Sequence, residues 1–166
     1  MNNSSQTSSP DLAGLLLAAD QRPAVERACV ELIDDYCRQR NGLRGRSMRT
    51  GLKLLRAIRK DAVDLGVARL LPRFCHALQP SYSAWQQSAQ ASYAQFLEQH
   101  ATDTASHMLK ITDAEVAAAD STAIRAAYRS LRAFAATEIQ RALPQVGELI
   151  QRQWELVDTS GAFASA

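Results

Sequence analysis

The chain has 166 residues, a net charge of +2 and 22% charged side chains, which fits one folded domain and excludes a highly charged disordered protein. Ala, Leu, Gln and Arg dominate, and Gly and Pro are few, which favours helices over strands. No apolar run reaches the roughly 20 residues of a membrane-spanning helix. The opening MNNSSQTSSP places no positive charge before the apolar run at 12–19, so export is not predicted and a cytoplasmic location is expected.

Apolar residues recur at helical spacing along most of the chain, and we find no alternation typical of a strand. Polar residues 1–10 are expected to be disordered, residues 11–158 to form one helical domain, and residues 159–166 to form a frayed C-terminal tail. The fold class is therefore predicted to be all-α, a single compact bundle of about seven helices. In chain order we expect helices over 11–20, 23–40, 47–60, from 61 or 64 to 78, 80–97, 102–118 and 120–157.

Three prolines and one Asn-Gly pair are expected to divide these helices. Asn41-Gly42 should end the second helix, because glycine readily adopts the conformation that follows a helix C-terminus. Pro72 should kink or restart its helix, since proline lacks a donor and clashes with the preceding turn. For the same reason Pro80 should begin a new helix, and Pro144 should bend the last long segment into a final helix ending near Val157.

The segment 44–60 concentrates the positive charge. It contains seven Lys or Arg residues and no acid; because the whole chain is +2 and this segment is +7, the remainder carries −5. On a helix with about 100° per residue, five of these residues share a sector of about 80°, opposite an apolar half. Arg59 falls beside that apolar half and is a candidate for pairing with a buried acid. The five residues of the basic row are Arg46, Arg49, Lys53, Arg56 and Lys60.

The basic row has two interpretations. In the first, water solvates it or acids on neighbouring helices pair with it, as is usual for a run of charge. In the second, it binds an anionic partner, to which Arg supplies forked hydrogen bonds and Lys point charges. The partner would be a phosphate-bearing ligand, an acidic protein or an anionic surface. A membrane surface requires the apolar half of the helix to be free, whereas we expect that half to face the core. Anion binding by a non-enzymatic domain is the main functional hypothesis.

Sequence-specific DNA binding is disfavoured. Ala62 and Gly66, followed by Val67, echo the turn of a helix-turn-helix motif, but the helix after that turn would contain Pro72. A recognition helix needs an uninterrupted backbone. The isoelectric point of about 8.6 is also low for a nucleic-acid-binding domain.

No catalytic or metal site is predicted, and no cofactor is expected. His100, Asp103 and His107 could share one helical face, but nothing marks the further ligand that a metal site needs. Cys75 and His76 are adjacent and would point about 100° apart on a helix, which prevents a nucleophile–base pair. Three cysteines are expected to be free thiols, buried as in a reducing compartment: Cys29, Cys37 and Cys75.

Two further hypotheses remain open. Tyr82, Trp85, Tyr93 and Phe96 could line a cavity for an apolar or lipid-like ligand, although aromatic residues at helical spacing more often form plain core. The protein could instead be a dimerising scaffold with an exposed apolar patch; the sequence does not indicate its oligomeric state. A second basic row is expected to form salt bridges, and to extend an anion pocket only if it packs beside the first: Arg125, Arg129 and Arg132.

Six short motifs are spread over most of the chain. They are Asn41-Gly-Leu, Arg56-Ala-Ile-Arg-Lys60, Leu70-Leu-Pro-Arg-Phe74, Ala77-Leu-Gln-Pro80, Ile111-Thr-Asp-Ala114 and Tyr128-Arg-Ser-Leu-Arg132. Together they resemble a family of small bacterial all-helical proteins known as a domain of unknown function. The resemblance implies a helical fold and a bacterial source, and it implies no activity and no catalytic residues.

Overall fold

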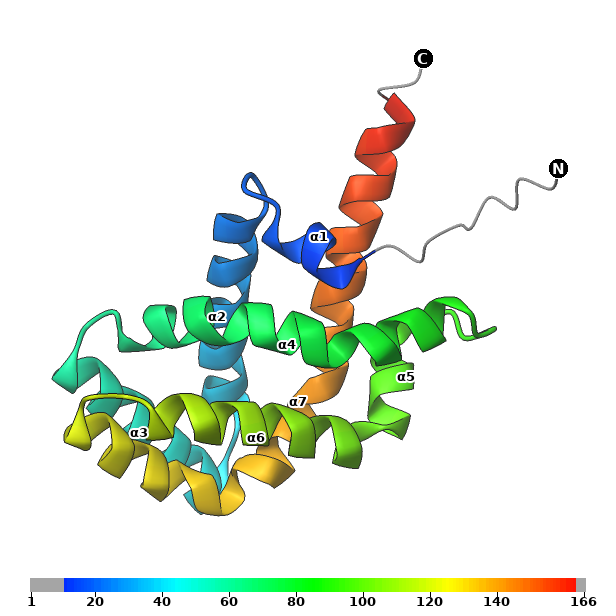
Figure 1. Cartoon of the computed structure of the whole chain (residues 1–166). Coiled ribbons are helices and arrows are strands. Elements are labelled where there is room, and N and C mark those ends of the chain that lie inside the picture. The colour runs from blue at the N-terminus through cyan, green and yellow to red at the C-terminus, as the bar shows by residue number, and fades with distance from the viewer. Residues whose placement is uncertain (1–10, 164–166) are drawn as a thin grey trace, which may run out of the picture.

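The computed structural model describes residues 11–163, which fold into seven α-helices without a strand (Figure 1). The all-α prediction is confirmed. Residues 1–10, expected to be disordered, and residues 164–166 of the expected C-terminal tail lie outside the described residues. The helices are α1 (Leu12–Leu17), α2 (Arg22–Gln39), α3 (Gly42–Ile58), α4 (Ala62–Gln86), α5 (Tyr93–Gln99), α6 (Ala101–Ala117) and α7 (Thr122–Phe163).

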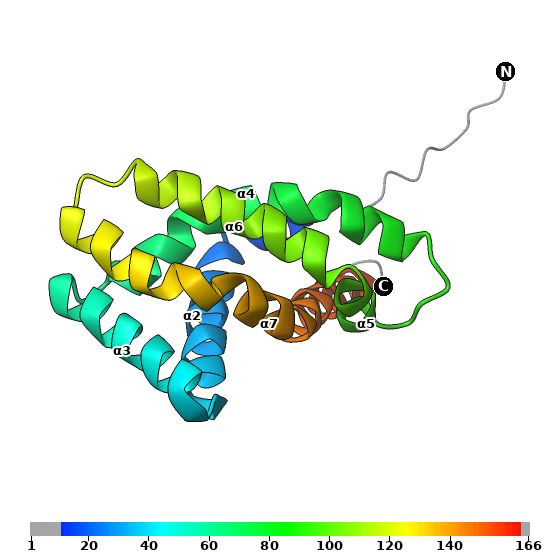
Figure 2. The same ribbon diagram turned by 90° about the horizontal axis from the view of Figure 1, so that it is seen from below.

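Helices α4 and α6 lie side by side, and α2 crosses behind them (Figure 1). Helix α7 changes direction in its middle: its first half runs beside α6 and α3, and its second half rises past α5 and α1. Figure 2 shows α3 at the outer edge of the molecule, beside α2 and the first half of α7. Helix α3, which carries the basic row, is therefore peripheral and rests on α2, α4 and α7.

The connection between α2 and α3 is the short turn that the Asn-Gly pair predicts. Arg40 leaves α2 with an extended backbone, and Gly42 has a φ of +75°, a conformation that favours glycine. The predicted stop is confirmed. Helix α3 begins at Gly42, earlier than the expected start at Ser47, so Arg44 and Arg46 also belong to it.

Helix α4 runs unbroken through two prolines. The prediction that Pro80 begins a new helix is wrong, and Pro72 does not restart one either. The missing N–H of Pro72 leaves the carbonyl of Ala68 without its helical donor. Nη2 of Arg22, on α2, donates to that oxygen at 3.1 Å. A partner from another helix therefore replaces the hydrogen bond that proline removes.

The expected helix over 80–97 is also wrong, because the chain leaves α4 at Gln86 and turns before α5. Nε1 of Trp85 donates to the carbonyl of Gln90 at 3.0 Å within this turn. The turn folds Tyr82, Trp85 and Tyr93 against one another, with ring centroids 5.1–5.7 Å apart. All three are buried. These aromatic side chains therefore form part of the hydrophobic core, which is the more usual role of aromatic residues at helical spacing.

Helix α7 contains Pro144 and bends in its middle (Figure 1), as predicted, but it continues as one helix to Phe163, beyond the expected end near Val157. Just after the bend, Gly147 lies against α5. A Cβ atom on Gly147 would stand 2.6 Å from the Cα atom of Ala94, closer than side chains approach backbone. The missing side chain therefore sets how closely α5 and α7 pack.

Candidate anion-binding groove

Helix α3 meets the rest of the molecule through small residues. Its buried residues are Gly45 and Gly51. A Cβ atom on Gly51 would lie 2.4 Å from Cδ2 of Leu131 on α7, so the two helices approach closely at this point. Met48 and Leu52 face the same side and are only partly buried. Helix α3 therefore contacts α7 closely at Gly51, while a space lined by Met48 and Leu52 remains beside this contact.

The apolar half of α3 is only partly covered, which corrects our expectation that it faces the core. Leu43 is 80% exposed and Leu54 is 48% exposed. Ile58, at the end of the helix, is also exposed. The peripheral position of α3 explains this exposure, because one side of the helix has no neighbour among residues 11–163.

Two arginines of the basic row hold α3 against α2. Nη1 of Arg49 donates to the carbonyls of Arg40 and Cys37, at 2.7 and 3.0 Å, and so caps the C-terminal end of α2. Arg56 makes a bidentate pair with Asp34, with both N–O distances at 2.9 Å. Hydrogen bonding to Asp34 raises the pKa of Arg56. These side chains fasten the two helices together with their charged groups facing the α2–α3 seam.

A groove of about 320 Å³ opens along this seam. Arg49, Lys53 and Arg56 line it from α3, and Arg38 lines it from α2. Its one acid is Asp34, which is already paired with Arg56. No hydrogen bond or ion pair within residues 11–163 engages Lys53. We call this feature the α2–α3 groove.

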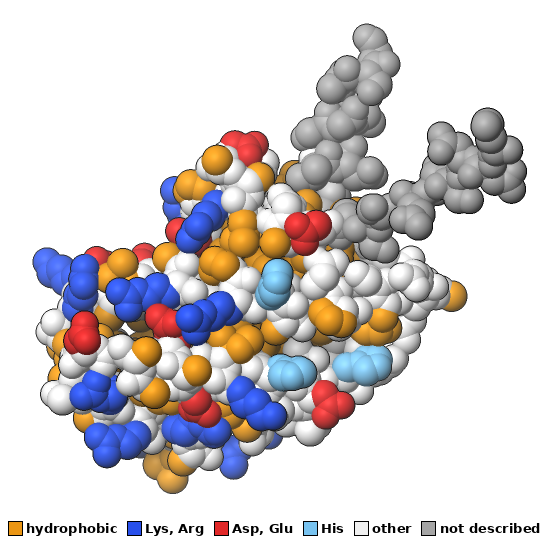
Figure 3. Space-filling view, in the orientation of Figure 1, with side chains coloured by type: hydrophobic (Ala, Val, Ile, Leu, Met, Phe, Trp, Pro, Cys, Tyr) orange, Lys and Arg blue, Asp and Glu red, His pale blue; other side chains and the backbone are white. Residues whose placement is uncertain are grey.

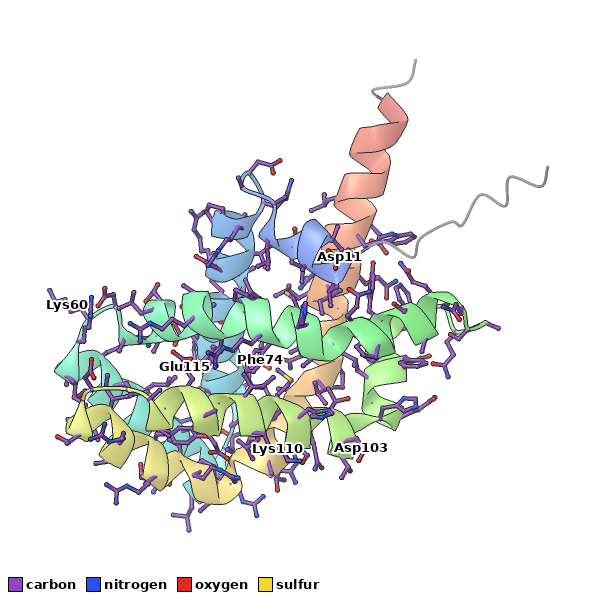
Figure 4. All side chains as sticks on the ribbon, in the orientation of Figure 1. Asp11, Lys60, Phe74, Asp103, Lys110 and Glu115 are labelled. Atoms are coloured by element: carbon purple, nitrogen blue, oxygen red, sulfur yellow. The ribbon has the colours of Figure 1, made fainter. Side chains whose placement is uncertain are left out.

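The other two residues of the predicted row lie outside the groove. Arg46 is exposed near the start of α3. Lys60 follows the end of α3 at Ile58, so it leaves the helical row, and Figure 4 shows it at the far end of the molecule, in the turn before α4. Arg59, which we expected to pair with a buried acid, instead pairs with exposed Asp61 at 2.7 Å. The structure therefore brings together three of the five predicted residues.

Sequence reasoning missed Arg38, and it missed a buried acid nearby. Arg38 lies on α2, one helix away from the basic block, and hydrogen-bonds to Asp35. The buried acid is Glu138 of α7, which is 4% exposed. Tyr36 donates its hydroxyl to Glu138 at 2.8 Å, and Arg40 Nε lies 3.0 Å from the same carboxylate. Glu138 lies between Thr137 and Ile139, and this local pattern does not indicate the network.

The Glu138 carboxylate has arginines around it from the end of α2, from α3 and from α7. Arg141 donates to it at 3.2 Å, and Arg44 of α3 reaches within 3.9 Å. Burial acts to raise the pKa of Glu138, but the hydrogen bonds from Tyr36 and Arg40 and the arginine charges outweigh it, so the pKa is lowered. The carboxylate therefore stays ionised, and it neutralises part of the positive charge near the groove.

Residues 12–154 match a protein family described as a family of unknown function, DUF6918. The match covers most of the chain. The chain belongs to this family. The six motifs suggested a helical family of unknown function, and this family match and the all-helical fold confirm that prediction. Comparison with curated proteins and with solved structures finds no match for the chain. A bacterial source and a cytoplasmic location stay predictions for this DUF6918 protein.

Two apolar cavities lie near the groove in this DUF6918 fold, and the second of them adjoins it. The first, of about 190 Å³, is lined by Leu, Ile, Val, Phe, Met and Cys side chains from α1, α2, α4, α6 and α7. The second, of about 220 Å³, lies between α2, α3 and α7, and Tyr36 and Glu138 stand at its edge. Neighbouring spaces share lining residues: Leu32 and Ile33 line both cavities, while Cys37 and Leu52 line the second cavity and the groove.

Of the second basic row, only Arg132 forms the expected salt bridge within residues 11–163. Arg132 pairs with Asp113 at 2.8 Å, and Arg125 donates to the carbonyl of Ala119. A comparable pairing joins α6 to α4, where Glu115 accepts from Arg73 at 3.1 Å; Figure 4 shows Glu115 between these two helices. None of these residues lines the α2–α3 groove.

Four other features considered in the sequence can be compared with the structure. Gly66 lies inside α4, so the turn that a helix-turn-helix motif requires is not formed there. Within residues 11–163 no group of three His, Cys, Asp or Glu side chains is placed to hold a metal ion. No helix of this part of the chain is both long and apolar enough to cross a membrane. The three cysteines are free thiols.

Proposed function

We propose that this protein binds a small anionic ligand, such as a phosphate or carboxylate group, in the α2–α3 groove without catalysing a reaction on it. The observation that carries the proposal is the imbalance of charge at this seam. Four cationic side chains line the groove. Asp34 pairs with Arg56 and Asp35 pairs with Arg38, so no carboxylate within residues 11–163 pairs with Arg49 or Lys53. Lys53 is left with no acid of its own.

The arginines of the groove are held in position before a ligand arrives. Arg49 uses only Nη1 for its two bonds to the end of α2, so its Nε and Nη2 groups are available to an anion. Fixing a guanidinium in advance lowers the entropy lost on binding. Figure 3 shows the opposite face, over α4 and α6, where Lys and Arg side chains are interspersed with Asp and Glu.

The groove offers binding groups but no nucleophile ready to react. Cys37 lines it, but burial raises the pKa of this thiol, so the thiolate that would attack a substrate is disfavoured. For this reason we propose a binding protein and not an enzyme.

The test compares pyrophosphate binding by Lys53→Gln with binding by the matched control Lys60→Gln, at constant ionic strength. Both substitutions remove one lysine charge, but Lys60 lies outside the groove. Calorimetric titration should show that Lys53→Gln weakens binding about tenfold, as loss of one charged hydrogen bond predicts, while Lys60→Gln binds like wild type. Reversing Arg49 or Arg56 is a poorer test, because both also hold α3 in place.

Two results would contradict the proposal. If wild type shows no saturable binding of pyrophosphate or phosphate, the groove is only a solvated seam. If both lysine variants lose the same affinity, the attraction comes from net charge and not from a site.

A further inference from the structure

We infer that the ligand of the α2–α3 groove is a single-chain anionic amphiphile, whose charged head lies in the groove and whose apolar tail enters the two cavities behind it. This inference rests on the proposed function, because it takes the groove as the place of the head. It adds the chemical class of the rest of the ligand.

Helix α2 forms one wall of all three spaces. Val25 and Cys29 line the first cavity, Leu32 and Ile33 line both cavities, and Arg38 lines the groove. Between Val25 and Arg38 this wall extends about 20 Å, at a rise of about 1.5 Å per residue. The wall is apolar along the first cavity and becomes charged at the groove, where Asp34 is paired with Arg56 and Arg38 adds a positive charge. A ligand that follows α2 must therefore be apolar at one end and anionic at the other.

The first cavity has the chemistry of a tail site. Every side chain that lines it is Leu, Ile, Val, Phe, Met or Cys. Its volume of about 190 Å³ exceeds the ~150 Å³ of an engineered apolar cavity that stays dry and binds benzene. Water gains no hydrogen bonds in such a space, whereas an alkyl chain regains the dispersion contacts that an empty cavity lacks.

The second cavity lies beside α3, whose buried positions are occupied by glycines. The buried residues of this helix are the glycines Gly45 and Gly51, which bring α3 close to its neighbours but fill no volume. Met48 and Leu52 only partly cover the space toward α7. The second cavity and the groove therefore adjoin beneath this peripheral helix, where the side chains of Cys37 and Leu52 line both.

The single buried acid beside the second cavity does not oppose an anionic head. Glu138 stands at the edge of the second cavity, but Tyr36, Arg40 and Arg141 bind its carboxylate. The groove itself lies beyond Cys37 and Leu52, on the cationic side. The head would thus meet Lys53, Arg49 and Arg38, with no uncompensated negative charge nearby.

The experiment measures the affinity of a series of straight-chain carboxylates and of alkyl phosphates, from four to fourteen carbons, below the concentration at which each forms micelles. Each added methylene should tighten binding about two- to fourfold until the cavities are full. Comparing the two series tells whether the head is a carboxylate or a phosphate. Dodecanol, which has the same tail without charge, should bind at least tenfold more weakly than dodecanoate.

Two substitutions at one position locate the tail. Cys29→Phe places a ring in the first cavity and should abolish the gain in affinity for chains longer than about eight carbons. Cys29→Ala leaves the cavity open and should keep that gain. Thermal unfolding checks that both variants fold. A second readout needs no mutation: bound dodecanoate should slow alkylation of Cys29 and Cys75, which line the first cavity, whereas pyrophosphate should not.

The outcomes separate this inference from the proposed function. If pyrophosphate binds through Lys53 but affinity does not grow with chain length, the groove is an anion site and the amphiphile inference is wrong. If dodecanol binds as well as dodecanoate and Lys53→Gln changes the affinity for neither, the tail binds in the cavities without any contribution from the groove. Both the proposed function and the amphiphile inference are then wrong. If anionic vesicles bind and Cys29→Phe leaves that binding unchanged, the contact is the outer face of α3, with its exposed Leu43 and Leu54, and the inference is overturned.

Discussion

At the scale of single residues, the structure sorts charged side chains into those that hold the fold and those that remain available. Arg56 and Arg49 are engaged by Asp34 and by the end of α2, and Glu138 collects Tyr36 and Arg40. A buried carboxylate is tolerated only when such partners replace its water. The groove is therefore lined partly by charged side chains that are already paired and partly by Lys53, which is not.

Glu138→Gln should destabilise the protein by about 3 kcal/mol at pH 7, because it leaves Arg40 partly buried without its counter-charge. Since the pKa of Glu138 is lowered in the folded state, its contribution is fully present above the unfolded value of about 4.3 and is lost as pH falls through the lowered folded value. Urea unfolding of both proteins at a series of pH values checks this. The stability difference should shrink below about pH 4; a constant difference would contradict the charge argument.

At the scale of helices, tertiary contacts can outweigh the low helix propensity of proline, as α4 shows. A proline inside a helix costs roughly 3 kcal/mol relative to Ala, yet α4 continues through two of them. Leu71, Cys75 and Leu78 form a buried stripe across the first proline, and Tyr82 extends it past the second. Burial of this stripe, together with the bond from Arg22 to Ala68, offsets the cost of Pro72.

The compensation at Pro72 can be measured with a double-mutant cycle. Arg22→Ala should cost about 1 kcal/mol, because the carbonyl of Ala68 loses its donor. In the Pro72→Ala background a backbone N–H is restored, so Arg22→Ala should cost less. Urea unfolding of the four proteins should give a coupling free energy of at least about 0.5 kcal/mol. Additive effects would mean that Arg22 acts only through its pair with Glu26.

At the scale of the whole molecule, α7 joins the parts, since it packs on α3 and α6 before its bend and on α5 and α1 after it. Two glycines set the closeness of this packing: Gly51 against Leu131, and Gly147 against Ala94. The contact at Gly147 is with backbone, which cannot turn aside as a side chain can. The fold therefore depends on small residues that no hydrophobic pattern would select.

Gly147→Ala and Gly66→Ala should change stability in opposite directions. Both glycines are helical, but a Cβ atom on Gly66 meets nothing within 4 Å, whereas on Gly147 it would lie 2.6 Å from the backbone of α5. Gly66→Ala should stabilise by about 0.5–1 kcal/mol, from helix propensity alone. Gly147→Ala should destabilise by about 1–3 kcal/mol, because α5 must move. Melting temperatures check both; a stabilising Gly147→Ala would show that α5 and α7 pack less closely.

The sequence by itself determined the features that depend on neighbours along the chain. Helical spacing predicted that the chain is helical throughout most of its length, although not the break between α4 and α5. The Asn-Gly pair predicted the turn before α3, and the charge count predicted a basic α3. Each of these rests on interactions within a few residues, which periodicity and composition describe. The membership of the chain in its family agreed with motifs of the same short range.

Only the tertiary structure decided which charges are engaged and where space remains. Asp34 pairs with an arginine 22 residues away, and Glu138 with a tyrosine 102 residues away. The second cavity depends on α3 meeting α7 at Gly51, and the path of α4 through Pro72 depends on Arg22. Such contacts form between helices whose relative positions are set by packing of the whole core. A local pattern therefore names the candidate residues, whereas the three-dimensional arrangement decides which of them face a common groove.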